Sequence, residues 1–185
     1  MKRVLDLALA IPLAVLASPF LLAAAIWIRL TSPGPAIFAQ ERIGQGETRF
    51  RCLKLRTMYQ GTASLPTHQV GDKAVTPAGR VLRARKFDEL PQLWNVVRGE
   101  MSLVGPRPCL PTQEELMKRR RELGVYALKP GITGLAQLEG VDMSDPETCA
   151  EKDAEYLETR SLGMDMKIVF MTLAGIGLRR RRPGS

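Results

Sequence analysis

The segment LALAIPLAVLASPFLLAAAIWI, residues Leu7–Ile28, contains no charged residue and decides what kind of fold the chain can adopt. As an α-helix it would be roughly 33 Å long at about 1.5 Å per residue, enough to cross the hydrocarbon core of a bilayer. A signal peptide is the alternative, because Lys2 and Arg3 precede the segment. Its apolar run is longer than the ~7–15 residues of a signal-peptide core, so the sequence predicts a membrane helix.

Basic residues flank this segment on both sides. Lys2 and Arg3 precede it and Arg29 follows it directly. Positively charged flanks stay on the cytoplasmic side, so a hairpin satisfies both ends and a single crossing does not. Ser18-Pro19 offers a bend, because proline removes a backbone donor and the Ser18 hydroxyl can bond the carbonyl that is freed. The residues alone leave open a kinked helix that crosses the membrane.

The composition indicates one basic domain with an anionic partner. The 185 residues carry a formal net charge of +8 and give a sequence pI of about 9.8. Nucleic acid, a phospholipid surface and a phosphorylated substrate all fit this charge. Aromatic residues make up 5% of the chain and are not interleaved with basic ones, which disfavours single-stranded nucleic acid.

Cysteine and histidine usage excludes several kinds of site. The three cysteines are odd in number and form no CxxC pair, so a disulfide framework or zinc site is not expected and a reducing compartment fits better. The one histidine, His68, lies in a polar stretch and is expected to be a solvated loop residue. A histidine-dependent triad or a multi-histidine metal site is therefore excluded.

Beyond the apolar segment, the pattern predicts a mainly helical α+β fold. Residues 43–58 indicate a β-hairpin, with Gly44, Gly46 and Glu47 marking its turn. Helices are expected over residues 79–86, 88–97, 113–123, 146–160 and 165–178. The last of these is too short to cross a bilayer and precedes Arg179–Arg182, so we expect it in the membrane interface. A core helix whose basic end complements the helix dipole is the alternative.

Two adjacent acids, Asp88 and Glu89, lie in the basic stretch RARKFDELPQLWNV (residues 83–96). The DELP sequence predicts a helix start with Asp88 at or near the N-cap. The same position suits phosphate chemistry, since free donors and the helix dipole attract an anion there. Two carboxylates can also bind Mg²⁺ together with substrate phosphate, and one of them could attack phosphorus to form an acyl phosphate.

Two later segments carry groups suited to phosphate binding. In GEMSLVGPRP (residues 99–108) the flanking prolines fix the backbone around Arg107, whose guanidinium matches phosphate oxygens in a bidentate manner. KPGITGLAQLEG (residues 129–140) is a glycine-rich loop with a cation, a hydroxyl and an amide.

The order and spacing of these blocks resemble the monotopic phosphoglycosyl transferases, the bacterial sugar transferase family. The resemblance extends over nearly the whole chain, from the apolar segment with central Ser18-Pro19 through the later motifs. Those motifs are QERIG (40–44), KLRTM (54–58), FDELPQLWNV (87–96), GEMSLVGPRP and KPGITGLAQLEG. The DELPQL and VGPRP blocks at this separation are its most specific part.

The resemblance implies an enzyme that moves a phospho-sugar from a UDP-sugar to polyprenol phosphate, usually undecaprenyl phosphate, and releases UMP. This is the first membrane step of glycoconjugate biosynthesis. Asp88 would attack the β-phosphate and carry the phospho-sugar covalently until the lipid phosphate takes it, in a ping-pong scheme. Mg²⁺ is the implied cofactor, with Asp88 and Glu89 as its ligands. Glu89 would help bind the metal or position the reacting groups.

The resemblance also implies a topology and a location. Residues 1–30 would form a re-entrant membrane helix hairpin broken at Ser18 and Pro19. Residues 31–185 would form a compact cytoplasmic catalytic domain with interfacial amphipathic helices and a small β-hairpin. The protein is then expected to be monotopic, at the cytoplasmic face of the bacterial inner membrane. Its expected partners are a UDP-sugar, polyprenol phosphate and the inner leaflet, without nucleic acid; a homodimer is left open.

The basic setting follows from the implied chemistry. A diphosphate, a lipid phosphate and carboxylates would repel one another without cations. Arg107 is the main candidate for binding substrate phosphate. Further phosphate-binding candidates are Lys54, Arg56, Arg83 and Lys129, and candidates for nucleotide or sugar contact are Thr133 and Gln137.

Two other functions remain as alternatives. A non-catalytic basic membrane adaptor would bind anionic lipid or nucleic acid, chiefly through Arg179–Arg182, and would tolerate Asp88→Asn. A hydrolase would release UMP from a UDP-sugar with water as the acceptor. The sequence does not name the sugar, since UDP-glucose, UDP-galactose and N-acetylated amino sugars all remain open.

Overall fold

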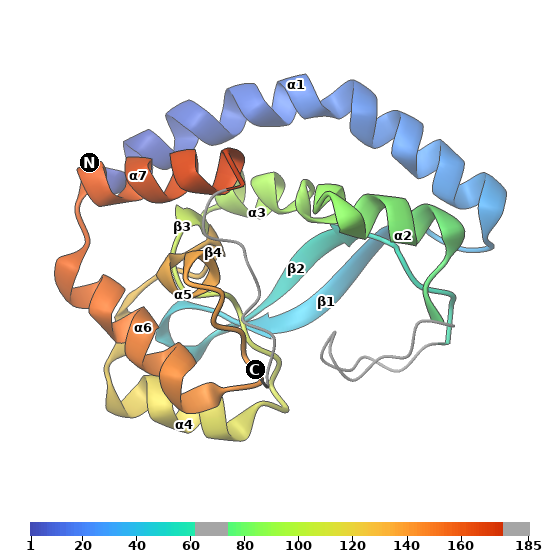
Figure 1. The fold of residues 1–185 in the computed structure, drawn as a ribbon. Coiled ribbons are helices and arrows are strands. Elements are labelled where there is room, and N and C mark those ends of the chain that lie inside the picture. The colour runs from blue at the N-terminus through green and yellow to red at the C-terminus, as the bar shows by residue number, and fades with distance from the viewer. Residues whose placement is uncertain (62–73, 176–185) are drawn as a thin grey trace.

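A computed structural model describes residues 1–61 and 74–175 of the chain (Figure 1). His68 and Arg179–Arg182 lie outside the described residues, so the expectations for them stay predictions. A long helix, α1 (Lys2–Thr31), arches over the rest of the chain, and shorter helices surround two small sheets beneath it. The α+β class is confirmed.

Helix α1 runs unbroken through Ser18-Pro19. Pro19 has no N–H to donate to the carbonyl of Val15, four residues earlier. The Ser18 hydroxyl donates to that carbonyl instead, at 2.7 Å, as the sequence predicted. This replacement bond satisfies the carbonyl that Pro19 leaves free, so the helix continues as one arch, and the expected break of a hairpin at Ser18 and Pro19 is not present. The helix is long and apolar enough to cross a membrane, and most of its outer side chains, such as those of Leu16 and Leu22, are exposed.

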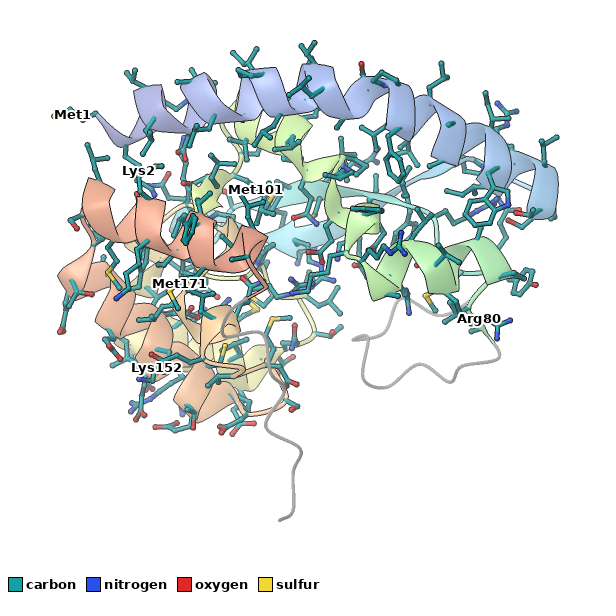
Figure 2. The ribbon with its side chains drawn as sticks, turned by 45° about the horizontal axis from the view of Figure 1, so that its top comes forward. Met1, Lys2, Arg80, Met101, Lys152 and Met171 are labelled. Atoms are coloured by element: carbon teal, nitrogen blue, oxygen red, sulfur yellow. The ribbon has the colours of Figure 1, made fainter. Side chains whose placement is uncertain are left out.

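The N-terminal end of α1 is bound to the rest of the domain by three polar side chains. Lys2 points toward α7 (Leu162–Leu173) and forms a 2.6 Å ion pair with buried Asp165 (Figure 2). Arg3 donates to two carbonyls near the end of α3 (Gln92–Arg98). The Asp6 carboxylate accepts from the Ser102 hydroxyl at 3.0 Å and from the next backbone N–H. This end of the helix is therefore fixed by groups that need a polar environment.

The C-terminal end of α1 is bound to the same domain. Arg56, at the end of the β-hairpin, donates to the carbonyl of Ser32 at 2.8 Å, to its hydroxyl at 2.9 Å, and to the Pro33 carbonyl. A guanidinium here also complements the negative end of the helix dipole. Both ends of the long helix therefore rest on one folded unit, with its apolar middle arched between them.

The predicted hairpin is present but begins earlier than expected. Strand β1 (Ile37–Ile43) pairs antiparallel with β2 (Arg49–Leu55), with Ile37 opposite Leu55 and Ile43 opposite Arg49. The turn spans Gln45–Glu47, and Gly46 has φ 62°, a conformation that glycine adopts without strain. The turn prediction is confirmed, whereas the first strand begins at Ile37, before the predicted start of the hairpin at residue 43.

The other helices match the expected positions to different degrees, except for the short helix α5, which was not predicted. Their bounds are α2 Pro77–Ala84, α4 Glu114–Glu122, α5 Leu135–Leu138 and α6 Pro146–Thr159. Helices α4 and α6 agree with prediction within one residue at each end. Asp145 caps α6 by accepting from the Thr148 N–H at 3.1 Å. Helix α7 begins three residues earlier than expected, because Ser161 caps it.

A second sheet was not predicted. Strands β3 (Ser102–Val104) and β4 (Gly131–Thr133) pair in parallel inside the two segments expected to be loops. Their backbones come so close that a Cβ on Gly131 would lie 2.1 Å from the Gly105 nitrogen. Glycine is therefore required there by space, and the pairing brings the VGPRP and ITGLAQ motifs together.

Candidate active site

Asp88 and Glu89 lie in a 3-10 turn, Phe87–Glu89, between α2 and α3. The prediction that Asp88 caps the following helix is wrong, because α3 begins at Gln92 and has no side-chain cap. The N–H groups of Leu90, Leu93 and Trp94 donate instead to the carbonyls three residues before them. The helix start is thus satisfied by backbone, which leaves the Asp88 carboxylate free for another role.

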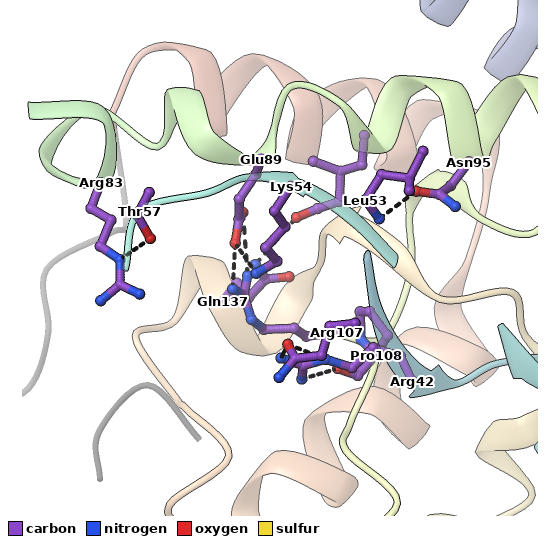
Figure 3. A network of polar contacts seen from close by, with 12 residues as sticks. Arg42, Leu53, Lys54, Thr57, Arg83, Glu89, Asn95, Arg107, Pro108 and Gln137 are labelled. Carbon is purple, nitrogen blue, oxygen red and sulfur yellow. Dashed lines mark hydrogen bonds and ion pairs between the residues drawn. The ribbon is translucent and has the colours of Figure 1, made fainter. Parts of the chain in front are cut away.

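Glu89 is neutralised by two cations from distant parts of the chain (Figure 3). Its Oε1 accepts from Arg107 Nη2 at 2.5 Å and from Lys54 Nζ at 3.1 Å, while Oε2 has a 3.5 Å contact with Arg107 Nη1. The Glu89 side chain is 12% exposed. Burial alone would raise its pKa, but Arg107 and Lys54 outweigh that effect and hold the pKa of Glu89 far below its usual range.

Asp88 has a different environment although it is the next residue. Within residues 1–61 and 74–175 its carboxylate forms no ion pair, and it remains partly exposed. Burial and then repulsion by Glu89 raise the pKa of Asp88, while Lys54 and Arg83 oppose that rise. We call Lys54, Asp88, Glu89 and Arg107 the carboxylate cluster. In this cluster Glu89 is immobilised by its ion pairs, whereas Asp88 forms no ion pair among the described residues and has a raised pKa.

Arg83 flanks Asp88 on the side of α2. Its Nε donates to the Thr57 hydroxyl at 2.8 Å, which fixes the plane of the guanidinium. In the described part of the chain no hydrogen bond is formed by its two terminal nitrogens, which point away from Thr57 (Figure 3). Such a fork suits a phosphate oxygen pair.

The pH dependence should follow Asp88. If its carboxylate is the attacking group, the reaction rate falls as pH drops through the pKa of Asp88. This acid limb of the rate-against-pH profile lies at a higher pH than it would for an aspartate with an ordinary pKa. Arg83→Met removes a cation that lowers this pKa, so the limb should move to higher pH. Rate-against-pH profiles test this, with Arg80→Met on the exposed face of α2 as the matched control. An unmoved limb in Arg83→Met would contradict the assignment.

The backbone that presents Arg107 is held from behind by two buried arginines. Arg120 donates to the Arg107 carbonyl at 2.9 Å, and Arg42 donates to the Pro108 carbonyl at 2.9 Å. The flanking residues Pro106 and Pro108 are buried, as expected for a rigid support. The predicted role of the prolines in fixing Arg107 therefore has two additional buried supports.

Of the remaining predicted residues, Thr133, Gln137 and the backbone of Lys129 lie near this backbone, whereas Arg56 does not. Gln137 is drawn with the cluster in Figure 3, and its buried Oε1 accepts no hydrogen bond from the described residues. Thr133 is buried, and its hydroxyl lies 2.7 Å from that of Thr172 on α7. Arg56 is buried against the end of α1. Lys129 Nζ lies beside Gly99, at the C-terminal end of α3.

Asn95 is a site-supporting residue that the sequence did not reveal. It is fully buried, accepts from the Leu53 N–H at 3.0 Å and donates to the Arg51 carbonyl at 2.8 Å and to Glu100 at 2.7 Å. The amide thus links α3 to the strand that carries Lys54 (Figure 3). The one available signal was a polar residue followed by two valines, which alone does not indicate a buried contact.

The donor set fits magnesium only when substrate shares it. Among the described residues, no group of three or more histidine, cysteine or acidic side chains is placed to hold a metal. Asp88 and the less engaged Oε2 of Glu89 offer carboxylate oxygens with free lone pairs. Because Mg²⁺ is commonly bound by one or two carboxylates together with substrate phosphates, this arrangement is compatible with the expected ion.

Known proteins resemble this chain over most of its length. The family model described as bacterial sugar transferase matches residues 1–178. A UDP-glucose:undecaprenyl-phosphate glucose-1-phosphate transferase of Caulobacter vibrioides is 44% identical over 95% of this chain and 69% of its own length. A UDP-N-acetylgalactosamine-undecaprenyl-phosphate N-acetylgalactosaminephosphotransferase of Aeromonas hydrophila is 40% identical over 96% of this chain and 45% of its own length. An undecaprenyl-phosphate galactose phosphotransferase of Salmonella typhimurium is 33% identical over 97% of this chain and 41% of its own length. The chain thus spans less than half of the latter two.

Proposed function

Because the chain belongs to the bacterial sugar transferase family, we propose that it transfers a phospho-sugar from a UDP-sugar to polyprenol phosphate, with undecaprenyl phosphate as acceptor, and releases UMP. The observation that carries this proposal is the contrast within the carboxylate cluster. Glu89 is immobilised by Arg107 and Lys54, whereas Asp88 is partly exposed, unpaired among the described residues and more basic than usual. An acid in that state suits nucleophilic attack.

The proposed reaction has two displacements at the same phosphorus. An Asp88 carboxylate oxygen bonds to the β-phosphorus of the UDP-sugar, and the bond from that phosphorus to the bridging oxygen breaks. UMP leaves with the bridging oxygen and its electron pair, which makes an aspartyl phospho-sugar. An oxygen of polyprenol phosphate then attacks the same phosphorus and releases Asp88 as a carboxylate. No proton transfer is required for either step.

The other residues of the site stabilise charge and fix geometry in this scheme. Arg83 presents a fork beside Asp88 for the transferred phosphate, and Glu89 fixes the orientation of Arg107 and Lys54. Mg²⁺, bound by substrate phosphate oxygens with Asp88 and Glu89, would neutralise the charge on the leaving group. Thr133 and Gln137 are proposed to contact nucleotide or sugar, whereas the hydrogen bonds of Arg56 to the end of α1 favour a structural role.

Intact-protein mass spectrometry tests the proposal. Detergent-solubilised protein is incubated with Mg²⁺ and a panel of UDP-sugars, without lipid acceptor. We expect a mass gain of one phospho-sugar that disappears when polyprenol phosphate is added, and the mass identifies the sugar. Sustained UMP release without acceptor would instead support a hydrolase. Neither adduct nor UMP across the panel would support the adaptor alternative.

The binding of both ends of α1 to one domain supports a monotopic arrangement. A helix that crossed the bilayer would place Lys2 and Ser32 on opposite faces, and one folded unit could not bind both. The apolar arch of α1 is therefore proposed to enter and leave the cytoplasmic leaflet of the inner membrane, as a re-entrant segment around Ser18-Pro19. The exposed apolar side chains of α7, including Phe170, are proposed to lie in the same interface.

Labelling of introduced cysteines tests this topology. The native thiols are buried, so Val4→Cys and Thr31→Cys can be labelled against a low background. A membrane-impermeant maleimide should label neither position in intact spheroplasts and both in inverted vesicles. Exposed Glu115→Cys in α4 serves as the control for the domain side. One end labelled from each side would establish a crossing helix and reject the re-entrant arrangement.

A further inference from the structure

The QERIG motif places two buried polar side chains behind Arg107. Side chains alternate along β1, so Gln40 and Arg42 face inward while Glu41 faces solvent, where it pairs with Arg49 at 2.8 Å. Gln40 is 8% exposed and Arg42 is 7% exposed. A buried guanidinium remains charged at neutral pH, so its surroundings decide what that charge does.

Arg42 is held by neutral oxygens. Its Nε and Nη2 donate to Gln40 Oε1 at 3.1 and 2.6 Å, and its Nη1 donates to the Pro108 carbonyl at 2.9 Å. Among the described residues no carboxylate forms an ion pair with it, because the neighbouring Glu89 is engaged by Arg107 and Lys54. The Gln40 amide thus fixes the guanidinium without neutralising it.

Arg120 offers an internal comparison. It donates to the Arg107 carbonyl, the neighbour of the carbonyl that Arg42 binds, and it is also buried. Its charge, however, is compensated by Asp153 at 2.6 Å. Two arginines therefore support adjacent carbonyls of one loop, one in an ion pair and one bound to an amide. Support of the loop does not by itself require an uncompensated charge.

Charge balance in the site indicates what the Arg42 charge can do. In the carboxylate cluster the cations Lys54 and Arg107 balance the ionised acids Asp88 and Glu89. Arg42 lies directly behind this neutral group and adds a positive charge that solvent screens poorly because it is buried. An incoming diphosphate meets a cluster whose own two cations, Lys54 and Arg107, are already paired, so the charge of Arg42 adds to that of the Arg83 fork in attracting it.

We propose that Arg42, oriented by the Gln40 amide, is a positioning residue whose uncompensated buried charge favours binding of the diphosphate of the sugar donor at Arg107. The inference rests on the proposed function for the identity of the donor. It assigns a role to QERIG that differs from simple loop support. It also explains why an amide and not a carboxylate stands at position 40.

Gln40→Glu tests the charge while preserving both hydrogen bonds from Arg42. Glutamate has the same length, accepts the same two hydrogen bonds and pairs with Arg42, so the melting temperature should stay unchanged or rise. The Kd for UDP, measured by isothermal titration calorimetry, should increase about tenfold, and the increase should persist at high salt because the charge is buried. The KM for UDP-sugar should rise more than kcat falls.

Gln45→Glu is the matched control. It makes the same chemical change in the same hairpin, at its exposed turn, and loses only one exposed hydrogen bond to the Ala127 carbonyl. Its UDP affinity should stay within about twofold of wild type at physiological salt. Equal UDP affinity in Gln40→Glu and wild type would overturn the proposal.

A second pair of variants tests the proposal independently, in case Gln40→Glu does not fold. Arg42→Lys retains the charge and loses the fork, whereas Arg42→Gln retains a donor and loses the charge. We expect Arg42→Lys to bind UDP more tightly than Arg42→Gln does. Equal or weaker binding by Arg42→Lys would overturn the proposal. Absence of an aspartyl adduct in wild type would reject the proposed function alone, since UDP binding is measured without turnover. Absence of UDP binding in wild type would reject both.

Discussion

Asp88→Asn is expected to abolish the covalent adduct and to reduce sugar-phosphate transfer by about 10⁴-fold or more, because the amide cannot displace UMP. The same substitution should leave the melting temperature in detergent unchanged or slightly raised. Asp88 has no ion pair among the described residues, and burial and Glu89 raise its pKa. Its ionised form therefore costs stability at neutral pH, and a neutral amide removes that cost.

Asp145→Asn is the matched control for this prediction. Asparagine caps helices as well as aspartate, so α6 should stay intact and the activity unchanged. Intact mass and radiolabelled lipid product are measured for both variants. A normal adduct in Asp88→Asn would move the nucleophile to another residue, and a large fall in melting temperature would show that Asp88 has a structural partner.

Glu89→Gln is expected to lose activity and stability together. The amide leaves Arg107 and Lys54 half-buried without their anion, which should cost about 2 kcal/mol or more, or roughly 4–8 °C in melting temperature. Transfer should fall by about 10²-fold, since Arg107 loses its orientation but the nucleophile remains. A slow adduct on Asp88 should therefore still form during long incubation.

The stability difference between wild type and Glu89→Gln should depend on pH. The pKa of Glu89 in the folded protein is lowered from its ordinary value of 4.5. The stabilisation is therefore complete above that ordinary value and is lost as pH falls toward the folded pKa. Melting curves between neutral and acid pH test this, with exposed Glu115→Gln as the control. A difference that does not shrink in acid would contradict the ion-pair explanation.

Elements that depend on local signals were predictable from the sequence. The turn of the hairpin, helices α4 and α6 and the proline compensation by Ser18 all follow from neighbouring residues. The β3–β4 sheet was missed because three-residue strands show no periodicity and exist through contact between distant segments. The start of α3 was misplaced because backbone carbonyls accept from the N–H groups at this helix start. No sequence pattern reveals such backbone contacts.

The sequence supplied candidate site residues but not the way in which the fold arranges them. Lys54, Arg56 and Lys129 are equally plausible phosphate ligands in sequence, yet only Lys54 reaches Glu89 in the fold. Arg56 is committed to carbonyls at the end of α1. The different states of Asp88 and Glu89 arise from cations far away along the chain, so adjacency gave no means of separating them.

The close contact between Gly105 and Gly131 has a consequence for engineering sugar specificity. Because a side chain at either glycine would enter the backbone of the other strand, the segments around VGPRP and ITGLAQ behave as one interlocked cassette. In a chimera that takes only one segment from a relative with a different sugar, that segment would no longer contact the segment with which it packs in the relative. If the proposed contacts of Thr133 and Gln137 set donor preference, it should be exchanged by transplanting both segments together.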